Sequence, residues 1–308
     1  MQILAGVGAA FIPFAGYFAG GFDSANISGI DKILFSDESR STLAATLTTA
    51  RRNPASMANS NVAGYVGGGF DTGNISGIDK ITFPADTKST LAGTLTSARR
   101  ELAGMANSGT AGYFGGGYDG SGPYTAGIDK ITFAADTKST IAGTLSAAVG
   151  SLAAMANSGT AGYFCGGENN SSVKVSTIDK ITFSSDAKST LAATLSTATM
   201  ELAAMANSGT AGYIGGGNDS TGRISRIDKI TFAADTKSTL AATLSQGTNV
   251  LAANAQSGTA GYFGGGMGPS NLSSIDKITF AADTKSTLSA TLSSARRVHT
   301  GFAHSGVL

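Results

Sequence analysis

The chain of 308 residues contains no tryptophan, one cysteine and two histidines. The single cysteine, Cys165, excludes an internal disulfide framework, so packing must stabilise the fold. Charged residues make up 13% of the chain, about half the usual share, and 21 Lys and Arg nearly balance 20 Asp and Glu. Because a nearly neutral chain creates no overall field that attracts DNA, we expect no nucleic-acid partner.

The longest apolar stretch is the N-terminal segment MQILAGVGAAFIPF. It is shorter than the roughly 20 residues that cross a bilayer, so membrane insertion is not expected. It also lacks a basic start and a convincing small-residue cleavage site, which disfavours a signal peptide. We assign residues 1–14 to an N-terminal extension with a structural role and residues 15–308 to one domain.

The chain is rich in internal repeats. The phrase A-G-Y-x-x-G-G recurs six times at steps of 48 to 50 residues, with its tyrosine at Tyr17, Tyr65, Tyr113, Tyr163, Tyr213 and Tyr262. The phrase I-D-K-I-x-F follows in register in all six copies. The copies fill the chain without a linker, which indicates one repeat domain.

Each copy is predicted to form four short strands. In the third copy these are expected at Leu102–Ser108, Ala111–Gly115, Ile128–Phe133 and Ser139–Leu145, since alternating and small apolar patterns are strand signals. Asp136 is expected to close the turn between the last two strands through nearby backbone N–H groups. A helix over Leu91–Leu102 is the alternative, which the density of Ser and Thr disfavours.

Four strands per unit of this length match a propeller blade better than a solenoid coil. The sequence therefore predicts an all-β protein, a six-bladed β-propeller of four-stranded antiparallel blades. The small residues of Leu102–Ser108 suit the crowded inner strand. Gly115, Gly116 and Gly117 suit a close approach of neighbouring backbone, and the Ile and Phe of I-D-K-I-x-F are expected to pack between blades.

Seven segments compete for six inner-strand places. The C-terminal candidate Val298–Ser305 aligns with Glu101–Ser108, and the N-terminal candidate is Leu4–Val7. We expect the C-terminal strand to close the ring, because only that segment keeps the repeat spacing to the next expected tyrosine. Joining the two ends of the chain in one blade protects the sheet edges.

The order of these motifs resembles a kelch repeat. The double glycine after an aromatic strand, as at Tyr113, Gly115 and Gly116, carries the resemblance. The tryptophan expected after the acidic turn is missing, and Thr140 and Ile141 stand near its place. The A-N-S-G-T-A-G-Y-F-G-G-G style of the copies also resembles kelch-like proteins of phage and marine-virus particles. The resemblance implies a propeller that serves as a structural or binding module.

No catalytic, metal or cofactor site is expected. His299 and His304 are interpreted as replacements for blade residues, since no further cluster of His or Cys accompanies them. Cys165 is interpreted as a small buried residue. The Gly-rich phrase is not a phosphate-binding loop, because no G-K-[ST] follows it.

Two sets of acidic residues repeat with the motif and are interpreted as structural. Six equivalent carboxylates do not provide the two distinct environments that separate a catalytic acid from a base. The I-D-K aspartates are expected to form salt bridges with the adjacent lysines or to bond turns. The second set is expected to serve in turns, and it comprises Asp37, Asp86, Asp136, Asp186, Asp235 and Asp283.

Function is expected where the copies diverge, chiefly in the loops between the second and third strands. These loops are Phe22–Gly29, Phe70–Gly77, Tyr118–Gly127, Glu168–Thr177, Asn218–Arg226 and Met267–Ser274. The side chains suit adaptable polar contacts and sugar stacking, but they also suit a plain solvated loop. The candidate binding residues are Tyr118, Asp119, Tyr124, Asn169, Asn170, Lys174, Asn218, Arg223 and Arg226.

Arginine pairs mark three of the six connections between blades. In a closed ring these connections are consecutive, so their arginines should cluster in one sector of the loop face. They suit a carboxylate or phosphate partner, or neighbouring acids of the same protein. Without interleaved aromatic residues, a subunit-docking patch is favoured over a nucleic-acid site. The pairs are Arg51 and Arg52, Arg99 and Arg100, and Arg296 and Arg297.

Two function classes follow, and both are non-enzymatic. The favoured class is a virion component, such as a phage fibre, tail or decoration protein, that assembles in the host cytoplasm and contacts other virion proteins or a host-surface glycan or protein. The alternative is a cellular or secreted kelch-like module that binds protein or glycan in an extracellular or cytoplasmic setting. A homo-oligomer is compatible with either.

Deletion of residues 298–308 tests the closure. We expect the truncated protein to aggregate or to lose cooperative melting, because the first blade would lack its inner strand and leave an edge open. Circular dichroism melting and light scattering measure this outcome. A truncated protein with an unchanged melting curve would rule out closure by the C-terminal strand.

Overall fold

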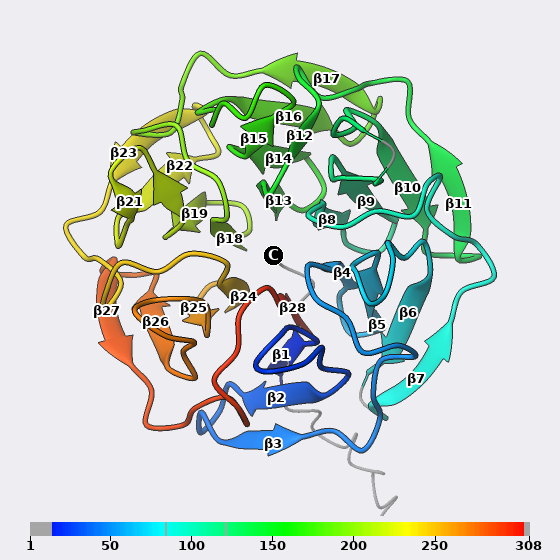
Figure 1. The fold of residues 1–308 in the computed structure, drawn as a ribbon. Helices are drawn as coiled ribbons and strands as arrows, with labels where there is room; N and C mark the ends of the chain where they lie inside the picture. Colours follow the sequence, from blue (N-terminus) through cyan, green and yellow to red (C-terminus); the bar gives the residue numbers. More distant parts are fainter. Residues whose placement is uncertain (1–13, 84, 121, 305–308) are drawn as a thin grey trace, which may run out of the picture.

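Six four-stranded antiparallel sheets stand around a common axis like the blades of a propeller (Figure 1). The computed structural model describes residues 14–83, 85–120 and 122–304. These residues form strands, turns and irregular segments and contain no helix. The predicted fold is confirmed, and the helix considered for residues 91–102 is wrong.

Each blade runs from an inner strand at the axis to an outer strand at the rim. Blade 1 contains β28 (Thr300–Ala303), β1 (Ala15–Ala19), β2 (Ile30–Leu34) and β3 (Arg40–Thr42). Blade 2 contains β4 (Ala55–Asn59), β5 (Ala63–Gly67), β6 (Ile78–Thr82) and β7 (Thr87–Thr90). Blade 3 contains β8 (Ala103–Asn107), β9 (Ala111–Gly115), β10 (Ile128–Thr132) and β11 (Thr137–Thr140).

The other three blades repeat this order. Blade 4 contains β13 (Ala153–Asn157), β14 (Ala161–Cys165), β16 (Ile178–Thr182) and β17 (Ala187–Thr190). Blade 5 contains β18 (Ala203–Asn207), β19 (Ala211–Gly215), β22 (Ile227–Thr231) and β23 (Thr236–Thr239). Blade 6 contains β24 (Ala252–Gln256), β25 (Ala260–Gly264), β26 (Ile275–Thr279) and β27 (Thr284–Thr287).

Four two-residue strands pair outside the blades. β12 (Val149–Gly150) pairs with β15 (Glu168–Asn169), and β20 (Asn218–Asp219) pairs with β21 (Gly222–Arg223). The outer strand of blade 3 ends at Thr140, so the expected fourth strand at residues 139–145 was placed too late. The segment beyond it is irregular, because Ile141 and Leu145 both turn inward and are buried.

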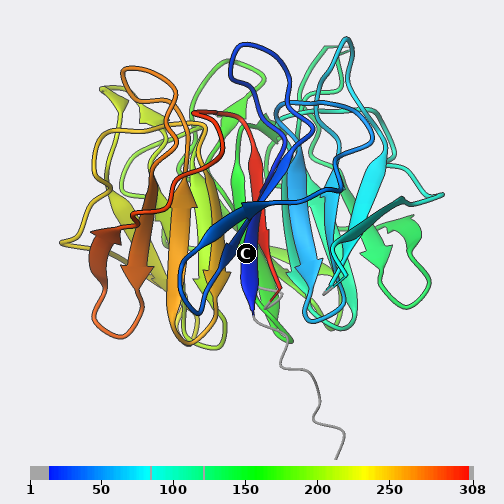
Figure 2. The ribbon, with the colours of Figure 1, turned by 90° about the horizontal axis from the view of Figure 1, so that it is seen from below.

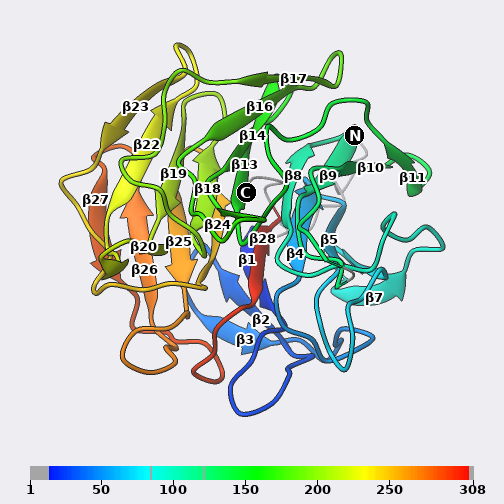
Figure 3. The same cartoon turned by 45° about the horizontal axis from the view of Figure 1, so that its top comes forward.

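The C-terminal strand closes the ring, as predicted. β28 pairs antiparallel with β1, and Phe302 lies opposite Tyr17, as Met105 lies opposite Tyr113 in blade 3. The two strands run side by side in Figure 3. The N-terminal candidate, Leu4–Val7, lies outside the described residues.

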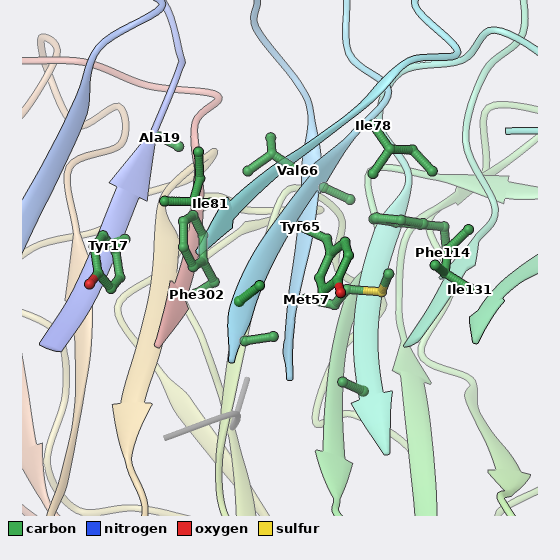
Figure 4. Packing of buried hydrophobic residues seen from close by; sticks show 14 of the residues in the cluster. Tyr17, Ala19, Met57, Tyr65, Val66, Ile78, Ile81, Phe114, Ile131 and Phe302 are labelled. Atoms are coloured by element: carbon green, nitrogen blue, oxygen red, sulfur yellow. The ribbon is translucent and has the colours of Figure 1, made fainter. Parts of the chain in front are cut away.

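Neighbouring blades interlock through a large side chain that lies over a glycine. A Cβ added to Gly112 would lie 1.9 Å from Met57 Sδ, and one added to Gly162 would lie 2.1 Å from Met105 Sδ. Met57 and Tyr65 belong to the buried layer between blades 2 and 3 (Figure 4). The glycine of each second strand therefore makes room for the inner strand of the preceding blade.

A second interlock shows matched volumes across the blade boundary. Cβ atoms added to Gly67, Gly115, Gly215 and Gly264 would lie within 2.8 Å of a phenylalanine of the next blade. At two boundaries the phenylalanine is replaced by a smaller residue, Val66 or Ile214. At these two boundaries the glycine is replaced by a larger residue, Ala19 or Cys165. Ala19 shares a core cluster with Val66, and Cys165 shares one with Ile214.

The acidic turn between the two outer strands clamps the preceding blade. Tyr65 Oη donates to Asp136 Oδ1 at 2.8 Å, and Lys80 Nζ lies 2.7 Å from Asp136 Oδ2. Asp86, Asp186, Asp235 and Asp283 accept the same two donors from their preceding blades. These aspartates were expected only to close their own turns, and their carboxylates instead join two blades.

The contacts of these turns differ from the sequence prediction in two respects. The lysines of I-D-K pair with these turn acids and not with the adjacent aspartates. In blade 1 the turn acid is Glu38, which pairs with Lys277, while Asp37 accepts the Ser39 N–H. Glu38 has a φ of 59°, like Asp86 at 53°, so Glu38 is the equivalent residue.

The I-D-K aspartates are buried and join blades in a different way. Asp79 accepts the Thr48 N–H at 2.9 Å and the Thr48 hydroxyl at 2.6 Å, both from the connection that leaves the preceding blade. The hydroxyl of Thr90, on the outer strand of the same blade, donates to the same carboxylate. Five further aspartates repeat this contact with a Ser or Thr of the preceding connection, namely Asp31, Asp129, Asp179, Asp228 and Asp276.

The matched volumes at Cys165 and Ile214 predict a reciprocal effect. We expect Ile214→Phe to destabilise the protein by about 1–3 kcal/mol, because the ring would overpack against Cys165. Cys165→Gly alone should also destabilise, because it removes a buried side chain. The double variant restores the Gly–Phe pair found at four other boundaries and should be more stable than the sum of the single effects by about 1 kcal/mol or more. Denaturant unfolding of the four proteins measures the coupling, and strictly additive values would contradict it.

Candidate binding face

The variable loops and the connections between blades share one face of the propeller, which is the upper side in Figure 2. The first residue of each loop forms a bridge with a residue of the adjacent connection. In three consecutive blades the bridge joins an aromatic residue to an arginine, namely Phe22 to Arg297, Phe70 to Arg52 and Tyr118 to Arg100. In the other three it joins Glu168 to Gly150, Asn218 to Met200 and Met267 to Asn249.

The first arginine of each pair lies inside the protein. Arg51, Arg99 and Arg296 are at most 2% exposed and pair with Asp79, Asp129 and Asp31. Burial lowers their pKa values from the ordinary value, and the paired aspartates oppose that effect. Of the two roles considered for these arginines, the structure gives these three the internal ion pair, so they do not form part of the exposed patch.

The second arginine of each pair stacks with the aromatic residues. Arg52 Cζ lies 4.7 Å from the ring centroid of Phe70 and 5.5 Å from that of Phe22. Arg100 Cζ lies 4.9 Å from the Phe70 ring and 4.6 Å from the Tyr118 ring. The planar guanidinium suits this stacking.

The stacking continues at both ends. Arg297 Cζ lies 5.5 Å from the Phe22 ring, and Tyr124 packs edge-on against Tyr118 with a centroid separation of 6.0 Å. We call this series the Arg–aromatic arc. It consists of Arg297, Phe22, Arg52, Phe70, Arg100, Tyr118 and Tyr124.

Phe22 and Phe70 were not among the candidate residues, and the expectation that the arginines lack interleaved aromatic residues is wrong. Each phenylalanine follows a Gly-Gly pair at the start of its loop, 30 residues before the arginine of the following connection (Phe22 before Arg52, Phe70 before Arg100). The repeat register contained this signal, because Tyr118 occupies the same place in the third copy.

Neighbouring polar groups contact two of the three arginines of the arc. Arg100 Nε lies 3.1 Å from Glu101 Oε1. Arg52 and Arg100 each donate through Nη1 to an asparagine of the adjacent loop, Asn26 at 3.3 Å and Asn74 at 3.1 Å.

The loops are joined to one another around the ring. Asn26 Nδ2 donates to Asp71 Oδ1 at 3.1 Å, and Asn74 Nδ2 donates to the Tyr118 carbonyl at 3.1 Å. Asn271 makes the same kind of contact with the Asp23 carbonyl. Because each loop holds its neighbour, the face is preorganised.

The remaining candidate residues hold the loops of blades 3 to 6. The side chain of Asn170 accepts the Tyr124 N–H and donates to the Tyr124 carbonyl. Asn169 Oδ1 accepts the Ser171 and Val173 N–H groups. Lys174 Nζ donates to Asn218 Oδ1 at 2.8 Å. Arg223 bonds Asn249, and Arg226 bonds Thr197. Asp119 lies beside Tyr118, and its charge opposes the lowering of the Arg99 pKa.

A ring of main-chain hydrogen bonds surrounds the axis on the same face. The ring has one residue from each of the six connections between blades. Each donates its N–H to the carbonyl of its counterpart in the preceding connection, at 2.7 to 3.1 Å, and the bond from the Asn53 N–H to the Val298 carbonyl closes the circle. All six have a positive φ. The ring consists of Asn53, Glu101, Ser151, Glu201, Val250 and Val298.

This ring borders a cavity of about 90 Å³ at the mouth of the axial channel. Burial raises the pKa of Glu201 above its ordinary value, and the negative charges of Glu101 and Glu168 act in the same direction. Asn249 donates to Glu201 Oε2 at 2.6 Å and opposes the shift, as does the positive charge of Lys174.

Both histidines are buried, and His299 is among the residues that line this cavity. His299 is buried against Phe18, at 5.8 Å between ring centroids, and burial lowers its pKa far below the ordinary value. His304 packs between Phe14 and Phe83. Cys165 is buried, and burial raises the pKa of its thiol.

In the described ranges no cluster of three or more His, Cys, Asp or Glu side chains could hold a metal ion. None of the described segments is a helix long and apolar enough to cross a membrane. No known protein-family model matches the chain, and no curated protein is significantly similar to it.

The raised pKa of Glu201 predicts a pH-dependent stability difference. The folded state disfavours the ionised carboxylate, so the contribution of Glu201 is most favourable below the unfolded pKa and is lost as the pH rises through the folded pKa. We expect Glu201→Gln to unfold at nearly the wild-type temperature near pH 4 and at a higher temperature near pH 7. Calorimetry at both pH values measures the difference. A stability difference that is the same at both pH values would contradict this assignment.

Proposed function

We propose that the chain is a non-enzymatic binding module that docks a protein partner through the Arg–aromatic arc, as a structural component of a virus particle. The observation that carries the proposal is the asymmetry of an otherwise regular ring. Three consecutive blade junctions present arginines stacked with aromatic rings, whereas the corresponding bridges of the other three contain Gly, Met, Asn and Glu.

The chemistry of the arc supports a protein partner. Tyr, Phe and Arg are enriched at protein–protein interfaces, and Tyr and Arg dominate binding hot spots. The joined loops lower the conformational entropy that binding would otherwise remove. The nearly neutral net charge of the whole chain also creates no overall field that would attract a nucleic acid or an anionic membrane.

The particle setting is supported by the sequence. The kelch-like style of six near-identical copies, rich in Gly, Ala, Ser and Thr, resembles that of particle proteins. A closed ring whose loops hold one another suits a fibre, tail or decoration protein, which presents a binding surface.

Sedimentation of native material tests the setting. We expect the chain to sediment together with virus particles. We also expect the purified chain to bind again to particles from which it has been removed. A chain that remains soluble and binds glycans on an array would overturn the proposal in favour of a lectin-like module.

Charge reversal tests the arc. We expect R52E/R100E/R297E to weaken particle rebinding at least tenfold, which corresponds to about 1.4 kcal/mol, because the variant removes both the charge and the stacking groups. The matched control R52K/R100K/R297K keeps the charge but removes the planar fork, so it should bind with intermediate affinity. Melting curves establish that each variant is folded. Undiminished rebinding by a folded charge-reversed variant would exclude the arc.

A further inference from the structure

In blade 2, main-chain carbonyls and the buried Asp79 form a binding site that holds the guanidinium group of Arg51. Arg51 Nη1 donates to the Gly68 carbonyl at 3.1 Å and to the Gly77 carbonyl at 3.4 Å. Its Nη2 lies 3.5 Å from the Val66 carbonyl and pairs with Asp79 Oδ2. Four oxygen atoms of one blade thus converge on the head of one arginine.

Blade 4 repeats this frame with a different residue in the place of the arginine. Val149 corresponds to Arg51, and both carbonyls accept the N–H of the second glycine of the preceding blade at 2.9 Å. The place where the guanidinium lies in blade 2 is a cavity of about 20 Å³ in blade 4. Its lining includes the counterparts of all four acceptor residues, which are Phe164, Gly166, Thr177 and Asp179.

The carboxylate of Asp179 is buried and oriented as in blade 2. Its Oδ2 accepts the Ser146 N–H at 2.7 Å, as Asp79 Oδ2 accepts that of Thr48 at 2.9 Å. Across the described stretches, no arginine reaches this oxygen in blade 4, whereas Arg51 does so in blade 2.

The lysine on the other side of the carboxylate does not replace the guanidinium. Lys188 Nζ lies 3.4 Å from Asp179 Oδ1. In blade 3 the corresponding Lys138 lies 3.3 Å from Asp129 Oδ1 while Arg99 Nη2 lies 3.0 Å from Oδ2 of the same carboxylate. One aspartate of this frame therefore accommodates both cations.

Blades 5 and 6 provide internal comparisons. In blade 5, Arg226 lines the corresponding cavity, and its Nε lies 3.7 Å from Asp228 Oδ1, so the chain supplies a guanidinium of its own. In blade 6, Thr248 stands in the place of the arginine and the cavity is about 10 Å³, half the volume of that in blade 4. Blade 4 therefore combines the largest cavity with an aspartate that no arginine reaches.

We propose that the cavity beside Asp179 in blade 4 binds the tip of a guanidinium group, which places one terminal NH₂ where Arg51 Nη2 lies in blade 2, beside the counterparts of Val66 and Asp79. The cavity has room for a group about the size of one water molecule, which matches one terminal NH₂ of the head. The site lies outside the Arg–aromatic arc, so it stands whether or not the arc docks a partner.

Small guanidines test the site in the intact chain. We expect N-methylguanidinium at about tenfold over its Kd to raise the melting temperature by roughly 2–4 °C, with methylammonium at equal ionic strength as the control. Methyl NMR should show shifts at Val149 and Val175, which line the cavity. No shift at these methyl groups, or an equal effect of methylammonium, would overturn the proposal.

Variants and analogues extend the test. Val149→Arg fills the site from within, and Asp179→Asn removes the charge, so each should abolish the melting-temperature rise. If either variant fails to fold, the NMR shifts of the wild-type chain still decide the question. N-acetylarginine amide against its citrulline analogue distinguishes the source of the group. Tighter binding than N-methylguanidinium identifies an arginine side chain of a peptide, and equal binding identifies a free small guanidine. Equal binding of the citrulline analogue would overturn the proposal.

Discussion

The close approach of neighbouring blades is the constraint on which the rest of the structure depends. Each inner strand sends a large side chain over a glycine of the next blade, so that Met57 occupies the place that a Cβ on Gly112 would need. A Cβ at such a glycine would displace the side chain that lies over it. Because the blades are held this closely, small changes of volume at the boundary are matched across it, as at Ala19 with Val66 and Cys165 with Ile214.

Polar groups join the same boundaries at three distances from the axis. The main-chain ring through Glu101 and Glu201 lies nearest the axis, the buried I-D-K aspartates lie farther out, and the clamps such as Tyr65 and Lys80 on Asp136 lie at the outer turns. A buried carboxylate without partners would be strongly destabilising. The buried I-D-K aspartates therefore depend on correct placement of the preceding blade, which supplies hydrogen bonds to their carboxylates.

The regular framework and the divergent loop face use different side chains. The repeated polar groups form contacts between blades, whereas the Arg–aromatic arc is present in only one half of the ring. The arginine pairs show the division within two consecutive residues. Arg51 points inward to an aspartate of the framework, while Arg52 lies between two rings on the loop face.

The sequence by itself determined the number of blades and their order through the repeat spacing, and the alignment of Val298–Ser305 favoured that segment as the strand that closes the ring. Only the tertiary structure decided which partner each repeated charge meets. Asp136 bonds Tyr65 and Lys80, more than 50 residues away. The stack of Arg297 on Phe22 joins the two ends of the chain. The reason is physical: local pattern specifies the strand and its face, but contacts between blades depend on the twist and spacing of sheets that form only when the ring is closed.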